Sequence, residues 1–288
     1  RNTKRSWDQS QLFNFVKAGD ILKIQLGLKA STDSEQIEDR LRYKPDVFEF
    51  YTSENDFTED GLKRFRYDFE WIKSKGVQKI VMHHPMRFHG QFTELIAPFD
   101  KCRDLYNFTA KSTNDLLQLA FDYDAQLLVH GSYSRQTQSY INMWGGVDQA
   151  REQAYRRIDS FADLGKNHIM FENSISPIFY YGDEKEDLYI FEKGYRLAFD
   201  TSHCFIKNQG SNEKLLASMK RLKEHVVHYH LVDSMGETHD SLPLGKGKID
   251  WEKALPLMND DATSIYEIIL KDQRDASEQV ASHEYLLG

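Results

Sequence analysis

Cysteine is scarce in this 288-residue chain, which contains only Cys102 and Cys204. The two residues lie far apart in the sequence, and no Cys-x-x-Cys pair occurs. We therefore expect neither a disulfide framework nor a cysteine zinc site, and this usage is typical of a protein of the reducing cytoplasm.

Long apolar runs and an excess of positive charge are also lacking. No run of about 18 apolar residues occurs, so we expect no segment that crosses a membrane. The formal net charge of -8 argues against a surface that is basic throughout, so a polyanion would have to be held by a local patch or by metal ions. The sequence opens at Arg1 without a methionine, which is compatible with a longer natural chain.

Eight strand-like segments alternate with helix-like segments along the chain. The helix pattern is clear between residues 59 and 75, where Leu62, Phe65, Phe69 and Ile72 recur at helical spacing. The segments expected to be strands are 21–28, 45–51, 77–84, 126–130, 167–172, 195–200, 225–232 and 263–268. Eight such cycles predict a (β/α)8 TIM barrel rather than an open doubly wound sheet. Without a proline-rich linker, we expect a single barrel domain over residues 21–288, preceded by a polar lead-in over residues 1–20.

The stretch 195–208 contains the first candidate site. A short apolar run ends in Asp200, and His203 follows three residues later. This spacing places a carboxylate and an imidazole at the mouth of a barrel, where both can reach one ion or two neighbouring ions. The same residues would also suit a helix N-cap, in which Asp200 accepts backbone N–H groups.

Other predicted strands end in the same chemistry. The residues concerned are His83, His84, His130, Glu172, His228, His230, Asp233 and Glu267, with Glu237 and His239 in the loop after residue 232. One such residue alone is usually a hydrogen-bonded loop or cap residue. Clustered without a counter-ion, however, these groups would be costly to bury, so together they predict a site for zinc, with manganese as the alternative. Among them we expect His83, His228 and Asp233, together with His89, to support the ligands rather than to bind.

The order of these motifs resembles the xylose isomerase-like TIM barrels (AP endonuclease family 2), which include endonuclease IV and many sugar isomerases and epimerases. The resemblance extends from about Leu22 to Ile268. It is strongest in the segments 171–173, 200–203, 230–234 and 244–249.

The resemblance implies ligands and roles. In isomerase-type members one ion is bound at positions that match Glu172, Asp200, His230 and Glu267, and the two glutamates also move protons. Nuclease-type members bind three zinc ions. Their ligand sets match His84, His130 and Glu172 for one ion; Glu172, Asp200, His230 and Glu267 for a second; and His203, Glu237 and His239 for a third.

Three departures separate the chain from the nuclease pattern. The third-ion motif reads Glu237-Thr238-His239 where the family has Asp-x-His, and the end of the first strand lacks the nuclease's His-Val-Ser. The loops that would enter DNA are not evidently basic, although Arg87, Phe88 and Tyr51 could serve there.

The function expected from these motifs is metal-dependent hydrolysis of a phosphoester, abasic-site DNA among the candidate substrates, at a centre of two or three zinc-type ions. The alternative is a single-metal isomerase or epimerase of a small sugar, in which Glu172 and Glu267 form the acid/base pair. A barrel that binds metal and a ligand without catalysis is the third class. The number of bound ions separates the first two classes.

Overall fold

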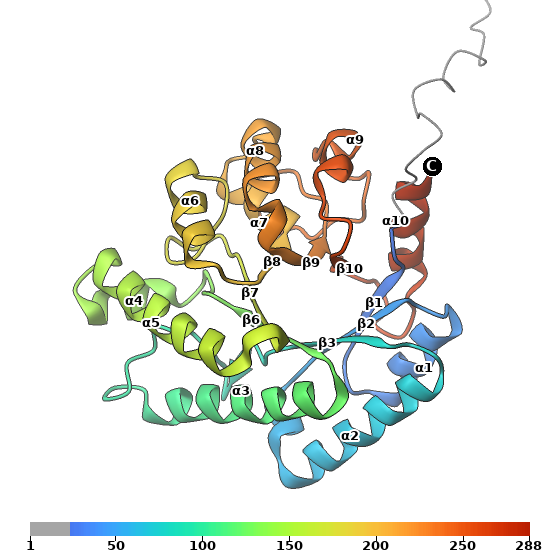
Figure 1. The fold of residues 1–288 in the computed structure, drawn as a ribbon, viewed down its shortest axis with the longest axis horizontal. Coiled ribbons are helices and arrows are strands. Elements are labelled where there is room, and N and C mark those ends of the chain that lie inside the picture. The colour runs from blue at the N-terminus through green and yellow to red at the C-terminus, as the bar shows by residue number, and fades with distance from the viewer. Residues whose placement is uncertain (1–23) are drawn as a thin grey trace, which may run out of the picture.

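The centre of the molecule is an eight-stranded sheet whose neighbouring strands all run parallel. The computed structural model describes residues 24–288, so the predicted lead-in over residues 1–20 lies outside the described residues. Figure 1 shows the strands in the middle and the helices arranged around them in chain order. The strands are β1 (Gly27–Ala30), β2 (Val47–Tyr51), β3 (Lys79–His83), β6 (Gln126–His130), β7 (Ile169–Glu172), β8 (Leu197–Asp200), β9 (Val226–Leu231) and β10 (Thr263–Tyr266).

The helices form an outer layer, and several of them begin at a residue that caps the free N–H groups of the first turn. Asp33 accepts from the N–H groups of Glu35 and Gln36, and Ser211 accepts from that of Lys214. None of the described helices is long and apolar enough to cross a membrane. The helices are α1 (Ser34–Arg42), α2 (Glu59–Ser74), α3 (Arg103–Tyr123), α4 (Thr137–Trp144), α5 (Val147–Gly165), α6 (Glu184–Lys193), α7 (Thr201–Lys207), α8 (Asn212–Leu222), α9 (Trp251–Ala254) and α10 (Ser277–Leu287).

The sheet curves until its first strand, β1, meets its last, β10. A Cβ atom built on Gly27 would lie 1.8 Å from the Ser264 carbonyl oxygen, so only glycine allows the two strands to approach this closely. The result is a nearly closed barrel with helices between its strands. The predicted (β/α)8 TIM barrel is thereby confirmed.

The interior of the barrel is built in layers, because alternate residues of a strand lie on the same face. The lower layer is a small apolar cluster that contains Val47, Val81, Leu128, Met170, Ala198 and Ile265. Two positions further along the same six strands, the residues are Glu49, His83, His130, Glu172, Asp200 and Glu267. The apolar layer therefore forms the floor beneath a layer of acids and histidines at the C-terminal ends of the strands.

Some elements differ from the prediction. The first strand runs over Gly27–Ala30 instead of 21–28, of which residues 21–23 lie outside the described part. Its pairing starts at Leu26, whose carbonyl accepts from the N–H groups of Asp46 and Val47. Apolar density alone does not mark where such pairing begins. The helix α4 and the hairpin of β4 (Arg87–Phe88) and β5 (Gln91–Phe92) were not predicted, whereas α7 is the helix implied by the alternative in which Asp200 is an N-cap.

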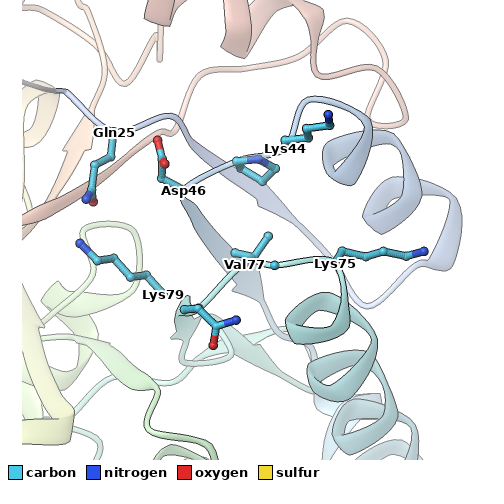
Figure 2. Close-up of a pocket in the computed structure, with 9 residues that line it drawn as sticks. Gln25, Lys44, Asp46, Lys75, Val77 and Lys79 are labelled. Carbon is cyan, nitrogen blue, oxygen red and sulfur yellow. The ribbon is translucent and has the colours of Figure 1, made fainter.

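A cavity of about 360 Å³ lies at the opposite end of the barrel, where β2 and β3 begin. Its lining includes Lys44, Lys75 and Lys79, together with Asp46. Figure 2 shows that Lys79 extends away from Lys44 and Lys75, so the three ammonium groups do not converge. The convergent chemistry of the molecule is at the other end.

Candidate metal centre

Two groups of ligand atoms share Glu172 at the C-terminal end of the barrel. The first group contains His83, His130 and Glu172, and the second contains Glu172, Asp200, His230 and Glu267. Within each group the ligand atoms lie within 4.8 Å of one another. A carboxylate with two oxygens can serve both groups, so the arrangement is suited to two neighbouring ions.

In the first group, two histidines direct their Nε2 atoms at one another and at Glu172. His83 Nε2 lies 3.1 Å from His130 Nε2, and His130 Nε2 lies 3.1 Å from Glu172 Oε2. The Nδ1–H of His83 donates to the His84 carbonyl oxygen at 2.8 Å, which leaves the Nε2 lone pair of His83 facing the centre. Burial lowers the pKa of His130 to about 3, so this imidazole is neutral and can offer a lone pair to an ion.

In the second group, Glu172 and Glu267 face the Nδ1 atom of His230. The distances from this nitrogen are 3.2 Å to Glu172 Oε1 and 2.7 Å to Glu267 Oε2. Burial alone would lower the pKa of His230, but Glu267, Glu49 and Glu172 outweigh it and raise the pKa well above its usual range. The cluster therefore favours a positive charge at this point, either a proton or a metal ion.

Asp200 combines two roles that the sequence left open. Its Oδ1 caps α7 by accepting from His203 N–H at 2.7 Å and from the Ser202 hydroxyl at 2.9 Å. The carboxylate also belongs to the second ligand group. A cap that fixes one oxygen leaves the other free, so the two roles are compatible.

Several buried atoms of these groups make no hydrogen bond of suitable geometry, although the Glu172 oxygens and His230 Nδ1 lie within 3.2 Å of a neighbouring ionisable group. They include both carboxylate oxygens of Glu172, Nδ1 of His230 and Nδ1 of His130. Burial alone would raise the pKa of Glu172, yet His130 and His230 hold it well below the usual range, so this carboxylate is ionised. Leaving ionised oxygens buried without hydrogen bonds costs several kcal/mol, whereas a divalent ion would satisfy them. The donor set of imidazole nitrogens and carboxylate oxygens without thiolate fits zinc or manganese.

His84, which the sequence suggested for the first group, lies elsewhere. It directly follows His83, the last residue of β3, and therefore faces outward, where its Nε2 contacts the Ser112 hydroxyl of α3 at 2.9 Å. Burial lowers its pKa to about 3. The structure thus brings together His83 and His130, and it places the neighbouring imidazole between the barrel and the helix layer.

The suggested third group is only partly assembled. His203 donates from Nδ1 to the Asn173 carbonyl oxygen at 2.9 Å, and its Nε2 lies 2.8 Å from His239 Nε2. Glu237 is exposed, and within residues 24–288 it makes no hydrogen bond or ion pair. Two facing imidazoles are thus present without the carboxylate that the motif implies.

Asp233 holds the loop that carries His239. The carboxylate of Asp233 accepts from the N–H groups of Ser234, Gly245 and Ile249 and from the indole of Trp251. Asp233 therefore anchors this loop and has no free oxygen for an ion.

Lys29 and Glu49 belong to the site although no sequence motif pointed to them. Lys29 forms ion pairs with Glu267 and, at 3.1 Å, with Glu49. Glu49 is fully buried and contacts both His228 and His230. Strand alternation could have identified both residues once the inward face of each strand is known. Each of them lies two positions after an inward-facing strand residue and therefore faces inward as well.

Residues 190–284 match the family model described as xylose isomerase-like TIM barrel. No curated protein sequence matches the chain significantly. Among solved structures, a D-tagatose 3-epimerase-like protein superposes with a TM-score of 0.67 at 16% identity, over 92% of this chain and 96% of that one. Endonuclease IV from Thermus thermophilus superposes with a TM-score of 0.61 at 18% identity, over 91% of this chain and 98% of that one.

D-Psicose 3-epimerase from Clostridium cellulolyticum superposes with a TM-score of 0.66 at 12% identity, over 92% of this chain and 98% of that one. At these identities the superpositions show the fold and leave the reaction undecided between nucleases and epimerases. The similarity to the xylose isomerase-like TIM barrels is therefore shown by the family model over residues 190–284 and by the fold over most of the chain.

Proposed function

We propose that this protein is a metal-dependent hydrolase of phosphoesters whose two ions are bound by the ligand groups that share Glu172. The observation that carries the proposal is that His83 and His130 lie at Oε2 of Glu172, whereas His230 lies at Oε1 of the same carboxylate. A single-ion isomerase needs only the group of Glu172, Asp200, His230 and Glu267. The additional imidazole pair of His83 and His130, directed at the same carboxylate, is explained by a second ion.

Bound divalent ions would supply a water of lowered pKa and positive charge for the phosphate oxygens. The protein's own residues supply geometry. Glu172 lies between the two groups, and the cap of α7 fixes the orientation of Asp200. The backbone carbonyl of His84 fixes the ring of His83. Three carboxylates, Glu172, Asp200 and Glu267, give the site a negative charge that two divalent ions would reverse, as an anionic substrate requires.

His203 and His239 lie beside this centre and are proposed to bind a third ion more weakly than the other two groups bind theirs. Two imidazoles at 2.8 Å are present, and the carboxylate of Glu237 would have to move in from an exposed loop. Ordering that side chain would cost binding free energy, so we expect partial occupancy.

Among phosphoesters, abasic-site DNA is a candidate substrate because endonuclease IV shares the fold.

The second candidate is a single-ion isomerase or epimerase of a small sugar. It is favoured by the epimerase folds and by the placement of both Glu172 and Glu267 at the Nδ1 atom of His230, where the two carboxylates could act as an acid/base pair.

The test compares His83→Ala with the wild type and with His89→Ala, which removes an imidazole from an exposed hairpin turn. Bound zinc or manganese is counted by mass spectrometry, and turnover is measured on an aryl phosphodiester, an abasic duplex and a panel of ketoses. The proposal predicts two or more ions in the wild type, one fewer in His83→Ala, and loss of phosphodiesterase activity in that variant alone. One ion in the wild type with ketose turnover that survives in His83→Ala would overturn it in favour of the epimerase.

A further inference from the structure

Glu49 is a fully buried carboxylate whose partners are all side chains of the barrel interior. Its Oε2 lies 2.9 Å from His228 Nε2 and 3.1 Å from His230 Nε2, and its Oε1 lies 3.1 Å from Lys29 Nζ. The charge of Glu49 is therefore compensated by an ammonium group of the protein itself. Both imidazoles share one oxygen, which can accept two hydrogen bonds.

The tautomer of His228 follows from its other contact. Its Nδ1 lies 2.6 Å from the Thr263 hydroxyl, whose other acceptor, the Val227 carbonyl oxygen, is more distant at 3.4 Å. The hydroxyl therefore donates to Nδ1, and the ring proton of His228 is on Nε2, from which it donates to Glu49.

His230 has the same orientation toward Glu49, with consequences for the ligand group. When its Nε2–H donates to Glu49, its Nδ1 carries the lone pair, and this atom faces Glu172 Oε1 at 3.2 Å and Glu267 Oε2 at 2.7 Å. A lone pair that faces two carboxylate oxygens is repulsive unless a cation lies among them. Histidines that bind metals commonly donate their other N–H to a carboxylate, which fixes the ring and its tautomer.

We propose that Glu49 is a positioning residue that holds His230 with Nδ1 toward the ligand group, and that Lys29 balances its charge. The inference rests on the metal centre proposed above.

Glu49, His228 and His230 could also be taken as a metal site of their own, since their ligand atoms lie within 4.8 Å of one another. The ammonium of Lys29 at 3.1 Å from Glu49 would repel an ion there, and the proton on His228 Nε2 occupies the position of the lone pair that such an ion would need.

The experiment uses Glu49→Gln, which retains the shape of the side chain, in the whole 288-residue chain. Zinc affinity is measured by competition with a chromophoric chelator, and the ring nitrogens of His230 are followed by 15N NMR of the zinc-loaded protein. We expect a 10- to 100-fold loss of affinity in Glu49→Gln, together with a shift of the His230 Nε2–H signal. Glu59→Gln, which removes an exposed carboxylate paired with Lys63, is the matched control and should change neither quantity.

A double variant, Lys29→Met with Glu49→Gln, separates hydrogen bonding from charge, because it leaves the net charge of the site as in the wild type. The positioning role predicts that the double variant still binds zinc at least tenfold more weakly than the wild type. Recovery to within twofold, or zinc bound through His230 Nε2 in the wild type, would overturn it. If the wild type binds no zinc, the proposed metal centre is wrong. The role of Glu49 is then tested by the Nε2–H signal of His230 alone. A signal that is unchanged in Glu49→Gln would overturn the positioning role, and a shifted signal would support it.

Discussion

Replacing Glu94 with glutamine should make the protein more stable at pH 8 and remove part of its pH dependence. Glu94 is fully buried in the loop between β5 and α3. Its carboxylate accepts from the Tyr133 N–H at 2.9 Å, from the Ser132 hydroxyl at 3.2 Å and from the Thr137 hydroxyl. It thereby ties this loop to the loop after β6, where the Tyr133 ring stacks on His130 at 4.6 Å.

The sign of the effect follows from the pKa of Glu94. Burial raises this pKa from 4.5 to about 7, although the three donors lower it in part. Between these two values the folded protein keeps a proton on Glu94 that the unfolded chain has released, so the free energy of unfolding falls as the pH rises through this window. The full difference is about 3 kcal/mol above pH 7, since one pKa unit is worth about 1.4 kcal/mol.

Glutamine cannot ionise, but it can keep most of the contacts. Its oxygen can accept from Tyr133 and Thr137, and its amide can donate to the Ser132 hydroxyl, which already accepts from Ser176 at 2.8 Å. Some hydrogen-bond strength is lost because a neutral oxygen accepts less strongly than a carboxylate. We therefore expect a net gain of about 1–3 kcal/mol at pH 8 and little change at pH 5.

The assay is urea unfolding followed by circular dichroism at pH 5, 6, 7 and 8, with a chelator present so that metal binding adds no pH dependence. Glu152→Gln, at an exposed carboxylate paired with Arg156 on the surface of α5, is the control and should follow the wild type at every pH. Parallel losses of stability in the wild type and Glu94→Gln between pH 5 and 8, or a less stable variant at pH 8, would refute the reasoning.

Two further predictions concern the centre and its loop. Zinc at a hundredfold excess over its dissociation constant should stabilise the wild type by about 2.7 kcal/mol, and Glu172→Gln should lose most of this gain in thermal unfolding; an equal gain in both proteins would exclude Glu172 as a ligand. Gly247→Ala should lower the free energy of unfolding by about 1–3 kcal/mol, because a Cβ there would lie 2.2 Å from Asp233 Oδ1 and 2.4 Å from the Ser234 carbonyl oxygen. Urea unfolding checks this, and an unchanged midpoint would show that the loop adapts without cost.

The sequence by itself determined the architecture. Eight apolar segments alternate with amphipathic ones, and parallel strands with crossover helices are the arrangement that buries both. In such a barrel all strands run the same way, so the residues at their ends must meet at one mouth. Glu172, Asp200, His230 and Glu267 could be placed together on that ground, and the structure assembles them in one group.

Only the tertiary structure decided which face of each strand those residues occupy. The strands are covered by helices outside and by side chains inside, so β3 is apolar from Ile80 to Met82 and carries no alternation to separate His83 from its neighbour. A shift of one residue reverses the face, and for this reason His84 was expected where His83 lies. Lys29 was not predicted as a site residue because the first strand begins later than its apolar residues suggest. Glu49 was not predicted because its partners are histidines of β9, far along the chain, and the sequence does not show that this contact forms.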